Sequence, residues 1–336
     1  MIISNLSLDL DEIETKYPES ALDFFRDKTL CLFKACLEAY FPGVRWGIQD
    51  LLEDLNLKVN TCDNQSCCSG TFFQRNLITR AQFAAINERN IYELNQQADI
   101  VLFSCNGCYN SLMRGREFLK NQEVKKKTEE LLSRLAKTIG IDKPKKYEIL
   151  ENPNVRFVHD LDFLYLIRED LLNSLKFNLN GFKVAVHYGC HYLNLSRDKR
   201  TVEAYLKDKT KLDELVKLFG GIPIDYQEKE SCCGWGASQL LMNPREALEI
   251  TYNKLNSAET VGADFILMPC PTCLYTLSKP EYRTKIHKWF GVKLDIPTIH
   301  INELIAILRG CEEERCITLR RKTPRIDEIF EIITKE

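Results

Sequence analysis

Two ten-residue stretches decide the fold: DIVLFSCNGC at residues 99–108 and DFILMPCPTC at residues 264–273. Each starts with an acidic residue, continues through an apolar run and ends in a CxxC motif. The apolar runs are short and rich in β-branched and aromatic residues, which predicts a buried strand leading directly into the cysteines. The two stretches are related by an offset of 165 in the numbering, so the same unit occurs twice along the chain.

Further cysteines repeat at the same offset, although the chain has only 14 of them. The cysteines that share the offset form two sets of four: Cys67, Cys68, Cys105 and Cys108, and Cys232, Cys233, Cys270 and Cys273. Four cysteines at one spacing indicate an internal duplication. A fifth cysteine precedes each set, Cys190 in the second half and either Cys36 or Cys31 in the first. Cys36 is favoured because it ends an apolar run, as Cys190 does, and Cys31 would then be a buried apolar side chain.

The segments around the cysteines predict an α/β fold. Apolar runs at 29–35 and 183–188 are further strands, and helical patterns lie between the strands, including one opened by Asn243 and Pro244. Residues 111–140 predict one long solvated helix. Alternating strands and helices favour two pseudo-symmetric repeats with mostly parallel sheet. Ligand sites of such sheets lie at the carboxyl ends of strands, where the sequence places the cysteines that follow each run: Cys36, Cys105, Cys190 and Cys270.

A chain of 336 residues is long enough for about two domains. Prolines and charges concentrate at 142–153, which favours a boundary there. We expect an N-terminal extension at 1–28, a first cysteine-rich domain at 29–150, a second at 151–310 and a charged C-terminal tail at 311–336.

Composition excludes several classes of protein. The formal charge of −2 argues against nucleic acid as the main partner, because phosphate binding needs a basic surface. No apolar run reaches the roughly 18 residues that span a bilayer, and the N-terminus carries acids instead of the basic residues of a secretion signal. We therefore expect a cytoplasmic protein. The cytosol keeps thiols reduced, so clustered cysteines there indicate metal or redox chemistry.

The spacing of the cysteines limits which kinds of metal centre the chain can bind. Adjacent residues on an extended backbone point in opposite directions, so a vicinal pair suits the different atoms of a larger cluster better than one small ion. Cubane clusters of the ferredoxin type show CxxCxxC runs, and this sequence has none. Five thiolates in each half favour an iron–sulfur cluster that is not an ordinary cubane. A zinc site using four of the five is the alternative.

The pattern resembles a known family. The arrangement Cys190…Cys232-Cys233-Gly234…Cys270-x-x-Cys273 is similar to the cysteine-rich "CCG" domain, here in two copies. The strings VAVHYGCH (184–191), DYQEKESCCG (225–234), CNGCYNSL (105–112) and VRFVHDLDFLY (155–165) resemble the B subunit of heterodisulfide reductase. The first copy departs from the motif, because it reads Cys67-Cys68-Ser69-Gly70. Its gap from Cys36 to Cys67 is slightly short, and the gap from Cys190 to Cys232 is slightly long.

The resemblance implies the cofactors, substrate and partners. It implies two non-cubane 4Fe-4S clusters that flank the disulfide of coenzymes M and B. Reduction of this disulfide is a reaction of methanogenesis. The ligands carried over to this chain are two sets of five: Cys36, Cys67, Cys68, Cys105 and Cys108, and Cys190, Cys232, Cys233, Cys270 and Cys273. Electrons would come from a ferredoxin-like C subunit, with a flavoprotein A subunit behind it, in an electron-bifurcating assembly with a hydrogenase or formate dehydrogenase. The chain has no GxGxxG fingerprint of its own.

Other functions stay open. Double CCG subunits also occur in thiol:fumarate and succinate:quinone reductases, in lactate- or glycolate-oxidising complexes and in sulfur oxidation, and a zinc-stabilised scaffold without catalysis is a further alternative.

Several residues outside the cysteine sets have two interpretations. His191 and His187 flank Cys190 and are candidate proton donors, since imidazole titrates near neutrality; the alternative is a packed, satisfied histidine. His159 is expected to be structural. The expectation for three cysteines outside the repeat is a free or buried thiol: Cys62, Cys311 and Cys316. Arg114 and Arg116 are expected to face solvent, with an acidic coenzyme group as the alternative.

Overall fold

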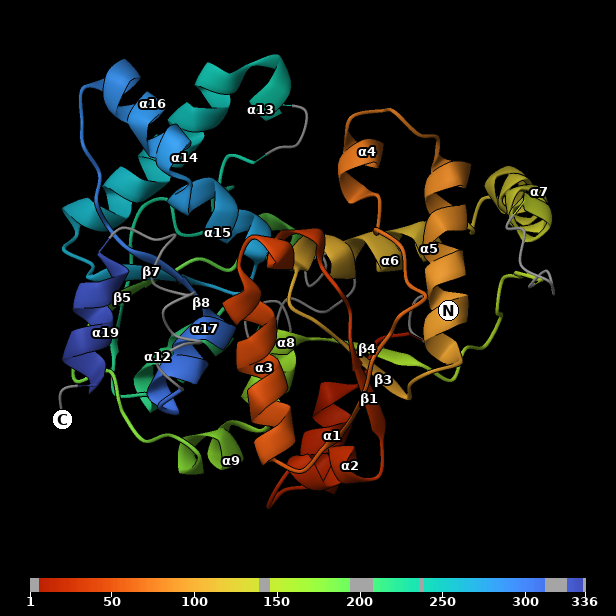
Figure 1. The fold of residues 1–336 in the computed structure, drawn as a ribbon, viewed down its shortest axis with the longest axis horizontal. Helices are drawn as coiled ribbons and strands as arrows, with labels where there is room; N and C mark the ends of the chain where they lie inside the picture. The colour runs from red at the N-terminus through yellow and green to blue at the C-terminus, as the bar shows by residue number, and fades with distance from the viewer. Residues whose placement is uncertain (1–5, 139–145, 194–207, 236–238, 312–324, 335–336) are drawn as a thin grey trace.

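The computed structural model describes residues 6–138, 146–193, 208–235, 239–311 and 325–334. Its strands form two four-stranded parallel sheets with the same order, β2-β1-β3-β4 and β6-β5-β7-β8 (Figure 1). The strands are β1 (Thr29–Leu32), β2 (Lys58–Asn60), β3 (Ile100–Phe103), β4 (Arg156–His159), β5 (Lys183–Val186), β6 (Ile222–Ile224), β7 (Phe265–Met268) and β8 (Thr298–His300). The predicted α/β class with two pseudo-symmetric repeats is therefore confirmed.

Helices connect the strands and cover the sheets. In the first half they are α1 (Leu10–Lys16), α2 (Leu22–Arg26), the 3-10 helix η1 (Cys36–Ala39), α3 (Pro42–Asp54), α4 (Gly70–Gln74), α5 (Arg80–Asn95), α6 (Asn106–Phe118), α7 (Gln122–Thr138), α8 (Asp160–Leu166) and α9 (Arg168–Asn173). In the second half they are α12 (Lys211–Leu218), α13 (Gln239–Met242), α14 (Pro244–Thr260), α15 (Pro271–Ser278), α16 (Pro280–Phe290), α17 (Ile301–Leu308) and α19 (Ile326–Thr334).

The two strands quoted first lie in the middle of their sheets. Every residue of β3 and of β7 is buried, as expected for parallel strands covered on both faces. Cys105 follows β3 as the N-cap of α6, and Cys270 follows β7 as the N-cap of α15. The strand therefore delivers each CxxC motif to the first turn of a helix at the carboxyl edge of the sheet.

Two predicted segment boundaries differ from those of the structure. The predicted single helix at 111–140 is wrong, because α6 ends at Phe118 and α7 begins at Gln122, where Asn121 accepts a hydrogen bond from the backbone of Val124 at 3.1 Å. Residues 139–145 lie outside the described part. Strand β4 lies beyond the expected boundary at 150/151 but belongs to the first sheet, where Ile100 of β3 pairs with Arg156.

The helices that follow the last strand of each sheet are exchanged between the halves. α17 follows β8 of the second sheet and packs along α3 of the first half, and Figure 1 shows the two helices side by side. α8 follows β4 of the first sheet and packs on α12 of the second half. Gly47 of α3 permits the close approach of α17, because an added Cβ would collide with the backbone oxygen of Asn302. Each half thus completes the packing of the other.

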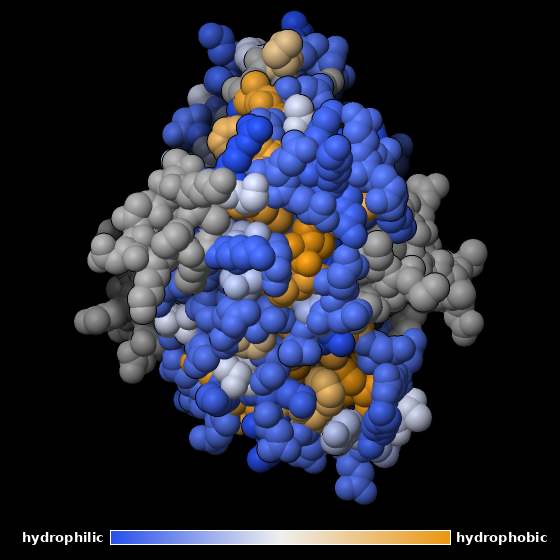
Figure 2. Space-filling model, turned by 90° about the vertical axis from the view of Figure 1, so that its right-hand side faces the viewer, coloured by the Kyte–Doolittle hydropathy of each residue, from blue (hydrophilic) through white to orange (hydrophobic). Residues whose placement is uncertain are grey.

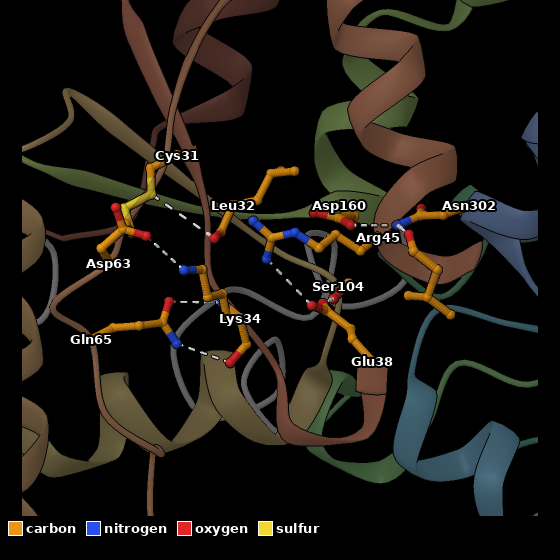
Figure 3. A network of polar contacts seen from close by, with 12 residues as sticks. Cys31, Leu32, Lys34, Glu38, Arg45, Asp63, Gln65, Ser104, Asp160 and Asn302 are labelled. Carbon is orange, nitrogen blue, oxygen red and sulfur yellow. Dashed lines mark hydrogen bonds and ion pairs between the residues drawn. A yellow bond between two sulfur atoms is a disulfide. The ribbon is translucent and has the colours of Figure 1, made fainter. Parts of the chain in front are cut away.

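A buried polar network holds the exchanged helices together (Figure 3). Asn302 donates to the carbonyl of Val44 at 3.0 Å and to the Asp160 carboxyl at 2.7 Å. Nearby, the hydroxyl of Ser104 donates to Glu38, whose carboxyl also lies 3.6 Å from Arg45. Burial raises the pKa of Glu38 to about 6. The network places side chains from both halves next to the residue that precedes Cys105.

Asp160 makes the stability of this network depend on pH. Burial raises the pKa of its carboxyl to about 7, so the folded protein keeps it protonated between about pH 4 and 7, where the unfolded chain ionises it. The stability that this carboxyl contributes is present below about pH 4 and is lost as the pH rises through 7. We therefore expect Asp160→Asn to gain stability over the wild type by on the order of 1 kcal/mol per pH unit across that range.

Urea unfolding at about pH 4.5 and about pH 7.5 measures this difference. An asparagine at this position can still accept from Asn302, so the comparison isolates the ionisable group. A difference between the two proteins that stays constant with pH would contradict the prediction.

The outer surface of the first half is mostly hydrophilic. Figure 2 shows this side with charged and polar residues over most of it and apolar residues in narrow strips. Among the helices that the structure describes, none has the length and apolar character needed to cross a bilayer.

Candidate metal centre

The first of two thiol sites lies at the carboxyl edge of the first sheet. Cys67 and Cys68 precede α4, and Cys105 and Cys108 begin α6. The thiol of Cys68 is hydrogen-bonded to those of Cys67 and Cys108, and Cys108 is in turn hydrogen-bonded to Cys105. Cys36, at the start of η1, interacts electrostatically with Cys68 and Cys67. The structure therefore brings together the five cysteines of the first predicted set.

The second thiol site repeats this arrangement. Cys232 is hydrogen-bonded to Cys190 and Cys233, and Cys273 is hydrogen-bonded to Cys233 and Cys270. The backbone nitrogen of Gly234 donates to Cys232 at 3.4 Å, as that of Ser69 donates to Cys67 in the first site at the same distance. The departure from the CCG motif at Ser69 keeps this contact, because Ser69 takes the same left-handed conformation as Gly234, with φ of 58° and 92°.

The two sites meet. The thiol of Cys105 is hydrogen-bonded to that of Cys270, and it also lies 3.7 Å from the hydroxyl of Thr272. The loops of the two halves are also hydrogen-bonded here, since the side chain of Asn106 donates to the carbonyl of Tyr188 at 2.7 Å. A continuous series of thiol contacts therefore runs from Cys67 in one half to Cys190 in the other.

Cys31 does not join the first site. The structure joins it to Cys62, just beyond β2, in a disulfide with the two Cα atoms 6.1 Å apart (Figure 3). Both side chains are buried, as expected, but the expectation of two separate thiols is wrong. A disulfide sulfur is not available as a thiolate, so the geometry favours Cys36 as the fifth donor. Cys311 is also paired through a disulfide, against the expectation of a free thiol, and Cys316 lies outside the described residues.

The donor chemistry fits a metal centre at each site. Hydrogen bonds with neighbouring thiols raise the pKa of Cys108 and Cys273, and such bonds lower the pKa of Cys68 and Cys232, so neighbouring thiols compete for protons. Metal ions deprotonate their thiol ligands and supply the missing positive charge. Thiolates select zinc, copper(I) or iron–sulfur centres. The ten clustered cysteines are thus the residues that would hold such centres.

The candidate histidines lie beside the thiols in different ways. His187 is fully buried, and its ring lies with the sulfurs of Cys233 and Cys273 in a group of possible ligand atoms within 4.8 Å of one another. Burial lowers the pKa of His187 to about 3, so the ring is neutral at neutral pH. His191 is partly exposed and accepts from the Gln74 amide of the first half at 3.0 Å. The neutral ring argues against His187 as a proton donor, and His191 remains a candidate.

His159 is structural, as expected, and sequence reasoning missed only its equivalent, His300. His159 ends β4 and His300 ends β8, and Nδ1 of each accepts a backbone hydrogen bond from the residue two positions on, at 3.1 Å. Nε2 of His300 therefore carries the proton and donates to the carbonyl of Ser104 at 3.2 Å. The signal was a histidine at the end of both edge strands, in FVHD and TIHI. Each ring caps the exchanged helix that follows.

The two arginines after the first CxxC motif differ in their surroundings. Arg116 is 1% exposed, contrary to the expectation of solvent, and it pairs with the buried carboxylate of Glu88 and the carbonyl of Leu150. Arg114 is exposed, as expected, with its guanidinium 5.8 Å from the ring centroid of Phe118.

The fold is α/β, and it contains two copies of a strand–CxxC–helix unit with five clustered cysteines in each. These features define a protein with two cysteine-rich domains. The comparisons agree: the family described as "CCG: Cysteine-rich domain" matches residues 30–113 and 184–278. The chain belongs to this CCG cysteine-rich domain family.

Two relatives and one solved structure show how far the similarity extends. The chain is 30% identical over 291 residues to the B subunit of the ferredoxin:CoB-CoM heterodisulfide reductase of Methanosarcina mazei, covering 84% of this chain and 89% of the relative. It is 24% identical to the 8-methylmenaquinol:fumarate reductase membrane anchor subunit of Wolinella succinogenes, over 81% of this chain and 92% of that one. A crystal structure of a hypothetical protein from Helicobacter pylori shares the fold, with a TM-score of 0.59 and 14% identity over 88% of this chain and 52% of that one. The predicted resemblance to the heterodisulfide reductase B subunit is confirmed.

Proposed function

We propose that this chain is the disulfide-reducing subunit of a heterodisulfide reductase-like complex. Each thiol site holds one non-cubane 4Fe-4S cluster, and the substrate disulfide, that of coenzymes M and B, lies between the two sites. Electrons come from a ferredoxin-like partner and, behind it, a flavoprotein. The observation that carries the proposal is the contact between the two CxxC loops, where the Cys105 thiol lies 3.7 Å from the Thr272 hydroxyl and interacts with Cys270.

The balance of the reaction explains why two sites are needed. Cleaving one S–S bond to two thiols consumes two electrons and two protons. Iron–sulfur clusters, when bound, supply one electron each and can hold a released thiolate. The protein itself would orient the disulfide between the facing loops and move the protons. His191 lies at the junction of the halves and is the proposed proton donor. The buried ring of His187 is neutral at neutral pH, so this role is not assigned to it.

The first experiment counts iron, acid-labile sulfide and zinc in anaerobically purified protein. We expect about eight iron and eight sulfide per chain, since two 4Fe-4S clusters contain that many. The coenzyme M–coenzyme B disulfide should then be reduced with a reduced viologen dye as donor. If the protein holds its iron but leaves this disulfide intact, the proposed substrate is wrong. The proposal of iron–sulfur centres would still stand.

One observation favours a zinc-stabilised scaffold as the second candidate. His187, Cys233 and Cys273 offer one nitrogen and two sulfurs in one small group, a donor set that zinc accepts. One or two zinc per chain with no sulfide would establish this alternative. A third possibility, a CCG subunit of another redox complex, is supported by the similarity to the Wolinella protein and predicts iron and sulfide without heterodisulfide reduction.

A further inference from the structure

Lys254 of α14 is a buried cation beside the second thiol site. Its side chain is 0% exposed, and its ammonium donates to the carbonyl of Glu228 and lies 5.4 Å from the ring centroid of Tyr226. Neither of these partners carries a full negative charge at the contact. Helix α14 runs beside the second thiol site, because Thr251, one turn before Lys254, donates its hydroxyl to the carbonyl of Cys233 at 2.9 Å.

The other buried cations of the described residues show what is unusual here. Lys211 pairs with Asp162 and Asp208, both at 2.6 Å, and Arg116 pairs with Glu88. A buried charge is costly unless it is paired. The ammonium of Lys254 instead bonds a backbone carbonyl, and burial lowers its pKa to about 8. The second site therefore has a buried positive charge beside it, which an anionic metal centre bound there would balance.

The first site has no matching charge. The N-caps of α5 and α14, Thr79 and Asn243, are 164 residues apart, and this offset places Asn90 opposite Lys254. Asn90 is also buried but neutral, and its amide donates to the carbonyl of Ser66 at 3.1 Å. The offset of 154 that relates Cys36 to Cys190 places Phe33 opposite His187. Phe33 stacks on Phe103 at 4.9 Å, so this part of the first site is apolar. The duplicated sites thus differ in charge although their cysteines match.

We propose that Lys254 is a positioning residue that sets the reduction potential of the second-site centre above that of the first-site centre, so that a single electron entering the chain resides at the second site. This inference rests on the proposed function, because it requires a redox centre held by Cys233 and Cys273. Reduction adds one negative charge to the centre. A fixed cation in a buried, low-dielectric position stabilises the reduced form more than the oxidised form. Lys254 itself gains and loses no electron.

The test is a potentiometric titration of the anaerobically purified full chain, followed by electron paramagnetic resonance. We expect Lys254→Met to lower the higher of the two potentials by at least about 59 mV, a tenfold change in a one-electron equilibrium. Lys254→Arg keeps the charge and should hold that potential near the wild-type value. Arg89→Met removes a half-buried cation of the first half next to the matching position, Asn90, and should leave both potentials in place.

The outcomes separate this inference from the proposed function. Absence of iron and sulfide in the wild type would remove the function and the inference together. Normal iron content with an unshifted potential in Lys254→Met would overturn the inference alone. Should Lys254→Met lose its second-site iron, the comparison of Lys254→Arg with Lys254→Gln decides. If only Lys254→Arg retains the second-site iron, the charge has the proposed role. If both variants retain the iron, or neither does, the inference is overturned.

Discussion

Cys108→Ser and Cys273→Ser are each expected to hold about half of the wild-type iron, about four per chain instead of eight, and to lose disulfide reduction. The two residues are equivalent second cysteines of the CxxC motifs, and each contacts two other thiols of its own site. A serine oxygen is a poor ligand for a soft metal centre, so one site should fail while the other stays assembled. Activity should vanish in both variants, because one remaining centre cannot flank the disulfide.

Cys62→Ser is the control for these variants. Cys62 is buried like the others but pairs with Cys31, apart from the ten clustered thiols. We expect it to keep the full iron content. Iron and sulfide analysis checks all three proteins, and full iron in either site variant would show that its cysteine is not a ligand.

Arg116→Met is expected to destabilise the protein by about 3–5 kcal/mol, because removing one partner of a buried ion pair leaves the other charge uncompensated. Glu88 is then left in the core between α5 and α6, with its side chain fully buried. Burial raises the pKa of Glu88, so the carboxylate can escape the penalty by taking up a proton. The loss of stability in the variant should therefore grow as the pH rises.

Arg114→Met measures the same chemical change at an exposed position two residues away, and its effect should stay within about 0.5 kcal/mol. The double variant Glu88→Gln/Arg116→Met should recover part of the loss, since it removes the stranded charge. Denaturant unfolding of the four proteins tests this series. Equal losses for Arg114→Met and Arg116→Met would contradict the role given to the ion pair.

The sequence predicted the parts of the fold that depend on local pattern. Apolar runs such as 100–103 identify buried strands because parallel strands are apolar on both faces. The constant offset between the two cysteine sets revealed the duplication, and strand ends located Cys105 and Cys270. These features need no knowledge of distant contacts, which is why the grouping of the cysteines could be inferred before any geometry.

Long-range pairing could not be predicted in this way. Nothing local shows that Cys31 meets Cys62, since that contact depends on β1 and β2 being neighbours. Arg116 resembles a solvated helix residue until Glu88 of α5 is placed against it. The assignment of β4 to the first sheet and the break at Asn121 likewise depend on tertiary packing, which overrides local propensity.

The exchange of α8 and α17 has a consequence for the origin of the chain. A single repeat would end in a helix with one face left uncovered, so it could not be a finished monomer. Two identical copies related by a two-fold axis would each receive the helix of the other, as in a domain-swapped homodimer. Joining the copies in one polypeptide turns this association into an intramolecular one, which no dilution can reverse. Fusion also frees the two copies to diverge, and Lys254 opposite Asn90 is a difference that no symmetric dimer could carry.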